Sequence, residues 1–269
     1  MPVTPPAGEP QAAPADVATT PTASHEYLLR IADDRLVLGH RLSEWCGHAP
    51  ILEEDIALAN VALDLIGQAT ALLDLAGRRE GRGRTADALA YFRETREWRN
   101  VQLVELPNGD FAFTIVRQFL FDAWDQLLLD ALGRGADAEL AGIAAKAAKE
   151  ARYHLRHSAE WVVMLGDGTV ESHARAQAAL DELWRFTGEP FLGDELDASL
   201  AAAGIAPDPA SLREPWLARV REVAAAATLR LPDDRSVARG GRRGLHTEHL
   251  GRMLAEMQSV ARAHPGAEW

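Results

Sequence analysis

The feature that most constrains the fold is a scarcity of strand-forming residues beside an abundance of helix formers. Valine and isoleucine together number 21 among 269 residues, whereas alanine and leucine number 84. Alanine and leucine have the strongest helix preference, and β-branched residues favour strands. The sequence therefore predicts an all-α protein, and its length is ample for one large domain or two small ones.

Apolar residues recur every three to four positions over several long segments, which is the pattern of helices with one buried face. Long helices are predicted at about 26–46, 50–76, 111–132 and 137–164. Shorter ones are predicted at 85–97, 169–186, 214–228 and 244–263, with 188–209 irregular. Short turns join the long helices into two hairpins, and a long connection crosses between the hairpins. This order predicts a ferritin-like four-helix bundle with additional C-terminal helices.

Residues 1–24 differ in composition from the rest of the chain. They contain six prolines and six alanines and almost no large apolar side chain. Such a segment cannot bury enough apolar surface to offset the entropy lost on ordering. We therefore predict a disordered leader at 1–24 and a helical domain at 25–269.

Charge and cysteine content argue against several partners and compartments. The formal net charge is −12, so a nucleic acid or an anionic membrane would be repelled on average, and neither is expected as a partner. Cys46 is the single cysteine, so no intrachain disulfide can form. No bilayer-spanning apolar run and no signal peptide are recognised, and the expected location is the cytoplasm.

A ferritin-like bundle invites a test for a di-iron site, which uses Glu-x-x-His on two helices and a further Glu on each of the other two. The sequence contains no Glu-x-x-His motif. Its nearest fragment is a stripe on the helix at 137–164, made up of Lys146, Glu150, His154 and His157. Glu150 and His154 could be ligands, but an ordinary face with a Lys146–Glu150 ion pair is favoured, because the other helices offer no matching acids.

Other reactive groups give weaker signals. His246 and His249 are three residues apart and could bind zinc, but a third ligand and a His-Glu-x-x-His frame are missing, so a polar packing or interface cluster is favoured. Cys46 stands at the C-terminal end of a predicted helix, which disfavours its thiolate. Two arginine clusters could hold a phosphate but are typical of solvated loops: Arg78, Arg79, Arg82 and Arg84, and Arg235, Arg239, Arg242 and Arg243.

Several long strings resemble one known family. They read RLSEWCGHAP at 41–50, EEDIALAN at 53–60, LDLIGQA at 63–69, PNGDF at 107–111, RQFLFD at 117–122, KEARYHLRH at 149–157, HTEHLG at 246–251 and AEMQ at 255–258. In this order they are similar to the C subunits of phenylacetyl-CoA 1,2-epoxidases, which are bacterial multicomponent monooxygenases. The likeness spans about residues 25–269.

This resemblance implies a structural, non-catalytic subunit with a ferritin-like fold. It implies as partners a catalytic A subunit, which carries the di-iron centre and binds the CoA thioester, and a reductase subunit. The reductase would deliver electrons from NADPH through flavin and an iron–sulfur cluster. The complex would epoxidise the ring of phenylacetyl-CoA during aerobic phenylacetate breakdown, and no cofactor, metal or catalytic residue is expected in this chain.

The resemblance also locates the lost metal ligands. The catalytic subunit has Asp-Glu-x-Gly-His where this chain reads DLIGQ at 64–68, so Leu65 and Gln68 occupy a ligand Glu and a ligand His position. On a later helix, Ala151 stands where the catalytic subunit has the Glu of Glu-x-x-His, while His154 is retained. Leu and Ala cannot ligate iron, and a lone imidazole with an amide is too weak a set.

Two hypotheses remain open beside the structural role. One is a charge network of Asp34, Lys146 and Glu150 that fills the former metal space, because buried ions must be paired. The other is a self-sufficient metalloenzyme that uses four ligands: Glu150, His154, His246 and His249. A stand-alone helical storage or interaction protein is a third possibility.

Overall fold

The computed structural model describes residues 21–233 and 237–267, and within them the all-α prediction is confirmed. The long helices are α2 (Pro21–Ser43), α3 (Leu52–Glu80), α6 (Phe111–Leu132) and α7 (Ala138–Gly166). The shorter helices are α4 (Ala86–Tyr91), α5 (Gln102–Glu105), α8 (Val170–Leu183), α9 (Glu195–Ala202), α10 (Arg213–Ala226), α11 (Glu248–Met257) and α12 (Ser259–Ala263). Short 3-10 turns lie at 95–97, 184–186, 189–191, 209–212 and 241–243.

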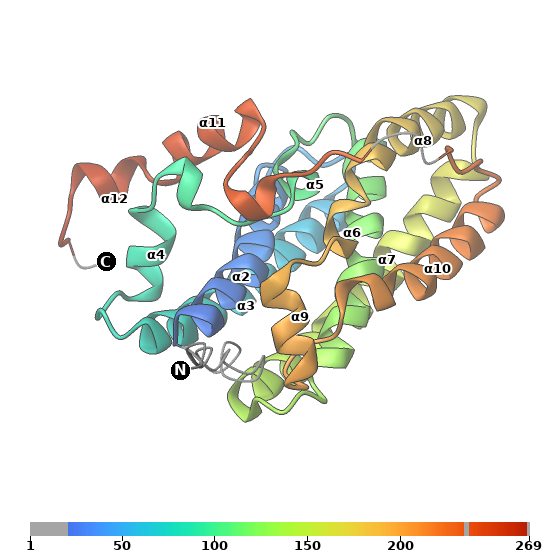
Figure 1. Cartoon of the computed structure of the whole chain (residues 1–269). Helices are drawn as coiled ribbons and strands as arrows, with labels where there is room; N and C mark the ends of the chain where they lie inside the picture. Colours follow the sequence, from blue (N-terminus) through green and yellow to red (C-terminus); the bar gives the residue numbers. More distant parts are fainter. Residues whose placement is uncertain (1–20, 234–236, 268–269) are drawn as a thin grey trace, which may run out of the picture.

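The long helices form the two predicted hairpins. Helix α2 packs along α3, α6 packs along α7, and α3 and α7 also meet. The connection that crosses between the hairpins is residues 81–110, with α4 and α5 inside it (Figure 1). Helices α8 and α10 pack on the second hairpin, whereas α11 and α12 lie at the α4 end of the molecule (Figure 1).

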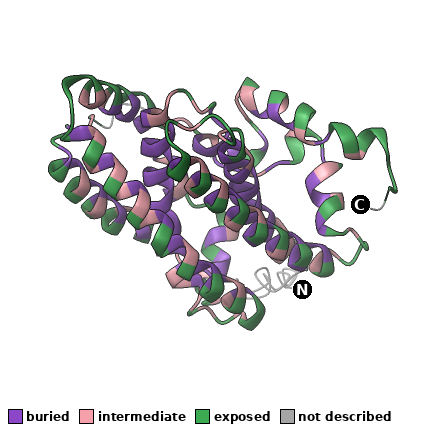
Figure 2. Cartoon of the chain, turned by 180° about the vertical axis from the view of Figure 1, so that it is seen from behind, coloured by how far each residue is buried: buried purple, intermediate pink, exposed green. Residues whose placement is uncertain are grey.

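Two of the long helices lie inside the bundle and two lie outside. Residues 27–39 of α2 and 114–126 of α6 are buried throughout, whereas α3 and α7 alternate between buried and exposed positions (Figure 2). Because α2 and α6 have no solvent face over these stretches, every polar side chain on them must find its partner inside the protein. The candidate site is built from these partners.

Helix caps agree with several predicted boundaries. Asp137 and Thr169 accept hydrogen bonds from Leu140 N and Ser172 N, as their residue types predict for helix starts. The predicted end of this helix at residue 76, just before Gly77, is wrong: α3 runs to Glu80, and Gly81 ends it with φ +72°. Gly77 instead permits a close approach, since a Cβ there would lie 2.1 Å from the carbonyl oxygen of Arg84.

The N-terminal boundary also needs correction. Helix α2 begins at Pro21, so residues 21–24 belong to it rather than to the predicted leader. The hydroxyl of Ser24 accepts a hydrogen bond from the guanidinium of Arg79 on α3. The rest of the predicted leader, residues 1–20, lies outside the described residues.

Three further segments differ from the prediction. Residues 85–97 are not one helix, because the Arg93 guanidinium turns inward to the carboxylate of Asp33 on α2 and the chain leaves the helix after Tyr91. The stretch at 188–209 contains α9, whose start is capped by Asp194. The last predicted helix begins at Glu248 rather than 244, after a cap by Thr247.

The expectation that no apolar run is long enough to cross a bilayer is also wrong. Helix α3 is long and apolar enough to do so by length and composition alone. In its most apolar window 44% of the residues are buried inside the protein. The core helix of a water-soluble protein gives the same signal.

Candidate functional site

A chain of polar side chains links all four long helices at the centre of the bundle. The Arg35 guanidinium on α2 donates from Nε to Gln68 Oε1 of α3 at 3.1 Å, and its Nη2 pairs with Asp125 of α6. Gln68 in turn donates from Nε2 to Glu150 Oε2 of α7 at 2.8 Å. The sequence-based prediction missed Arg35 and Asp125. The available signal was an arginine and an aspartate inside the otherwise apolar strings LLRIADDRLVL and RQFLFDAWDQLLL.

The Arg35 guanidinium is fully hydrogen-bonded although no part of it reaches solvent. Its Nη1 donates to the carbonyl oxygen of Ile31 at 2.7 Å, so each guanidinium nitrogen has an acceptor. Burial raises the pKa of Asp125 to about 6, although the Arg35 charge opposes this rise. The middle of the bundle therefore holds the Arg35 cation beside a carboxyl group that binds a proton more readily than an ordinary aspartate.

A second buried acid lies one turn away on α6. Asp122 accepts hydrogen bonds from Ser158 Oγ and from Gln118 Nε2, both at 2.7 Å. Burial raises the pKa of Asp122 well above its ordinary value, and the nearby Asp125 charge adds to the rise. No cation is bonded to Asp122 among the described residues, and its two hydrogen bonds include one that joins α6 to α7.

The seam between α3 and α7 is polar. His154 Nε2 lies 3.0 Å from Asp64 Oδ2, and His157 Nε2 lies 3.0 Å from Glu54 Oε2. Burial lowers the pKa of His154, and the bond to Asp64 only partly offsets it. His154 therefore acts as a buried neutral hydrogen-bonding group that links two helices.

The predicted network of Asp34, Lys146 and Glu150 is wrong. Asp34 pairs with Arg242, at 2.8 Å between Oδ2 and Nη2, and accepts from Val101 N at 2.8 Å. Lys146 is exposed, and Glu150 is bonded to Gln68 instead. The prediction placed Lys146 on the buried apolar side of α7. In the structure that side includes Ala144 and Ala148 instead, because the side of α7 that faces α3 is polar. These two alanines are buried.

The positions that the resemblance matches to metal ligands hold two apolar side chains and an amide. Leu65 and Ala151 are buried, and Gln68 turns its amide to Arg35 and Glu150. Among residues 21–233 and 237–267 no three His, Cys, Asp or Glu side chains converge as metal ligands. An arginine cation at the centre also repels a metal cation, so this donor set does not fit a di-iron centre.

The four ligands of the metalloenzyme hypothesis do not meet. Glu150 and His154 lie at the α3–α7 seam, whereas His246 precedes α11 and bonds Glu105 Oε2 at 2.8 Å and the carbonyl of Trp98 at 3.0 Å. The backbone carbonyl of His249 accepts from Arg41. The contacts of the His246 side chain agree with its interpretation as part of a polar packing cluster.

The arginine clusters mostly contact carboxylates. Arg79 pairs with Asp137, Arg84 with Glu80, and Arg78 with Glu139. In the second cluster Arg242 pairs with Asp34, and Arg235 lies outside the described residues. Cys46 is exposed just beyond the end of α2.

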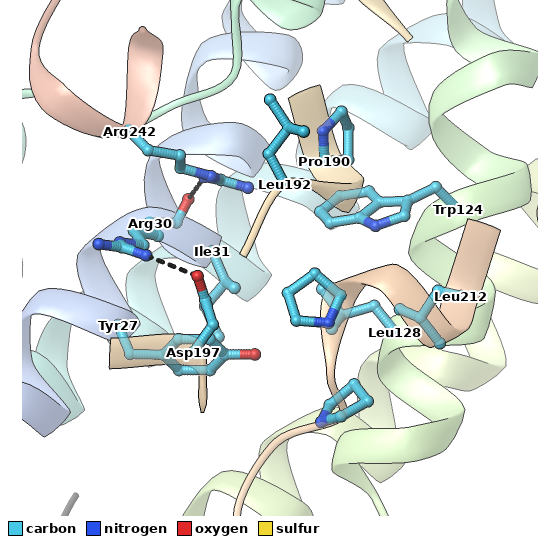
Figure 3. Close-up of a pocket in the computed structure, with 12 residues that line it drawn as sticks. Tyr27, Arg30, Ile31, Trp124, Leu128, Pro190, Leu192, Asp197, Leu212 and Arg242 are labelled. Carbon is cyan, nitrogen blue, oxygen red and sulfur yellow. Dashed lines mark hydrogen bonds and ion pairs between the residues drawn. The ribbon is translucent and has the colours of Figure 1, made fainter. Parts of the chain in front are cut away.

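A small cavity lies between α2, α6 and the segment that carries α9 (Figure 3). It has a volume of about 30 Å³ and is lined by Tyr27, Ile31 and Trp124 among others. Trp124 Nε1 is buried without a hydrogen-bond partner in the described part of the chain. The volume suits a single water molecule that would satisfy this donor, and it is too small for an organic substrate.

Comparison with known proteins places this arrangement in a family. The model of a family described as phenylacetic acid catabolic protein matches residues 9–269. The chain belongs to this phenylacetic acid catabolic protein family. A curated relative, the C subunit of the 1,2-phenylacetyl-CoA epoxidase of Escherichia coli (strain K12), is 51% identical over 243 residues, which cover 90% of this chain and 98% of the relative.

Membership in the phenylacetic acid catabolic protein family confirms the ferritin-like fold expected from the sequence. The curated relative confirms the resemblance to epoxidase C subunits. The ferritin-like fold is associated with a metal centre between four helices. In this chain the Arg35–Asp125 pair and the Gln68 amide are bonded to one another inside the bundle, and Leu65 and Ala151 are buried.

Proposed function

We propose that this chain is a non-catalytic structural subunit of a multicomponent di-iron monooxygenase that epoxidises phenylacetyl-CoA in aerobic phenylacetate catabolism. Its role is to bind and stabilise the catalytic A subunit, which carries the di-iron centre. The observation that carries the proposal is the Arg35–Asp125 pair. The Arg35 guanidinium bonds Gln68, which the resemblance matches to a ligand histidine, and neither a guanidinium nor an amide supplies the carboxylate and imidazole donors of a di-iron centre.

The similarity to the relative supports the choice of enzyme. At 51% identity over nearly the full length of both chains, the curated relative is named as the C subunit of an epoxidase. From this similarity we propose that the chain is part of a cytoplasmic complex that binds neither nucleic acid nor a membrane. In this complex a reductase subunit supplies electrons through flavin and an iron–sulfur cluster from NADPH, and no cofactor is bound by this chain.

The proposal is tested by producing the catalytic subunit with and without this chain. The expected result is co-purification of the two chains, a higher melting temperature of the catalytic subunit, and epoxidase activity with reductase only when both are present, because binding to the folded state stabilises it by mass action. A catalytic subunit that is equally stable and fully active alone would contradict the proposal.

A further inference from the structure

The outer side of α3 carries an uncharged apolar row. Leu52, Ile56 and Leu63 are 72%, 53% and 66% exposed. Their spacing of four and seven residues puts them on one side of the helix, together with the uncharged Ala59 and Thr70. Single exposed apolar residues are ordinary on a protein surface, but a row along about five turns of one helix marks a contact surface.

The neighbouring outer side of α7 carries a cationic row. Lys146, Lys149 and Arg156 are exposed, and none forms an ion pair within the described residues. The two lysines are the only lysines of the chain. Tyr153 lies between them and Arg156, 46% exposed, with the Arg156 guanidinium 5.5 Å from its ring centre. In a chain of net charge −12 this row is a local concentration of unpaired positive charge.

A groove lies between the two rows. It has a volume of about 230 Å³. Its apolar or small lining residues are Leu63, Gly67, Ala71, Ile143 and Ala147, and its polar ones are Asp64, Gln68, Lys146 and Glu150. A Cβ at Gly67 would meet no atom within 4 Å, so the groove has room for a side chain from another molecule.

We infer that this surface, the α3–α7 outer face made of Leu52, Ile56, Leu63, Lys146, Lys149, Tyr153 and Arg156, is where the catalytic subunit docks. The complementary surface on that subunit is a helix with an apolar ridge, which enters the groove, flanked by carboxylates that face the lysines. The inference rests on the proposed function, and it adds the location and chemistry of the contact. Charge complementarity selects an acidic partner surface, since a second copy of this chain would bring the same cations together.

The test combines an affinity-tagged catalytic subunit with full-length variants of this chain, produced in the same cells. Ile56→Asp/Leu63→Asp should lower the amount retained by the tag at least about tenfold, since each such step is worth 1.4 kcal/mol of affinity. Lys146→Glu/Lys149→Glu/Arg156→Glu should also lower retention and remove its dependence on salt. All five side chains are exposed, and the thermal melt of each variant alone checks that it folds.

Matched controls lie elsewhere on the surface. Val170→Asp changes a more exposed apolar residue on α8, at 90% exposure, and Arg134→Glu/Arg221→Glu/Arg230→Glu makes the same change in charge away from the face. Both should retain the catalytic subunit as the unmodified chain does. Retention unchanged in the face variants would overturn the inference. So would loss of self-association alone, which would assign the face to a contact between copies. If the unmodified chain itself fails to co-purify, the proposed function is what fails.

Discussion

At the scale of single residues, the protein depends on charges that are buried and almost completely paired. Arg35, Arg93 and Arg242 each reach from one segment to a carboxylate on another, namely Asp125, Asp33 and Asp34. Breaking such a pair leaves one charge without compensation in a medium of low polarity, which costs more than the pair contributes when both partners are present. The energetic consequences are therefore asymmetric and measurable.

Replacing Arg35 by Met should destabilise the fold by about 3–5 kcal/mol, because Asp125 is left buried without its cation. Urea unfolding at pH 7 measures this. The double variant Arg35→Met/Asp125→Leu removes both charges and should recover much of the loss. If the single variant were as stable as the unmodified protein, the pair would not hold the bundle centre.

His246 gives a pH dependence with a defined sign. Burial alone would lower its pKa, but the bond to Glu105 and the contact with the Trp98 carbonyl outweigh burial and raise it. Because both ring nitrogens face acceptors, the folded state favours the imidazolium. A raised pKa adds stability below the ordinary pKa of about 6.5, and this contribution is lost as the pH rises through the folded-state value.

We therefore expect the difference in unfolding free energy between the unmodified protein and His246→Gln to be largest near pH 6 and to shrink toward pH 9. Comparing the two proteins at each pH cancels the titration of other groups, including Asp125. A difference that grows with pH would show that His246 is neutral in the folded protein.

At the scale of helices, the two internal glycines of α3 have opposite roles. A Cβ at Gly77 would lie 2.1 Å from the Arg84 carbonyl oxygen, whereas one at Gly67 would meet nothing within 4 Å. Gly67→Ala should stabilise by about 0.5–1 kcal/mol through helix propensity. Gly77→Ala should destabilise by about 1–3 kcal/mol through the clash. Thermal unfolding of the two variants measures both effects, and shifts of the same sign would show that the two glycines do not differ in this way.

Prediction of the helices from the sequence succeeded where local chemistry sets the boundary. Asp137 and Thr169 start helices by accepting a backbone hydrogen bond, which their residue types indicate without knowledge of the fold. Prediction of the helices failed where a residue distant in the sequence determines the boundary. Helix α4 ends because Arg93 reaches Asp33, sixty residues before it in the chain. Gly77 looked like a helix stop, but it marks a close approach of the 81–85 loop.

The candidate site shows the same division. The absence of Glu-x-x-His could be read from the sequence alone, whereas the match of Leu65 and Ala151 to ligand positions stays a prediction from the resemblance. The partners of the buried charges could not, because periodicity gives the face of a helix but not the residue opposite it. Thus Asp34 was assigned to Lys146, whereas the structure pairs it with Arg242 from the far end of the chain.

At the scale of the whole molecule, a ferritin-like bundle holds a buried arginine–aspartate pair at its centre. Residues 27–39 and 114–126 of the two central helices have no side that faces solvent. The space between them holds the Arg35 guanidinium, and this cation disfavours a metal cation in the same space. We propose that the outer helices α3 and α7 contact the catalytic subunit.

The iron content of this chain tests whether the bundle holds the Arg35–Asp125 pair in place of a metal centre. The chain is expressed in iron-supplemented medium, purified in its folded form and analysed by elemental mass spectrometry. We expect well under one iron per chain, both as purified and after incubation with ferrous iron. Two irons per chain, retained through gel filtration and lost together with Glu150→Gln or His154→Ala, would show instead that the bundle centre is a metal site.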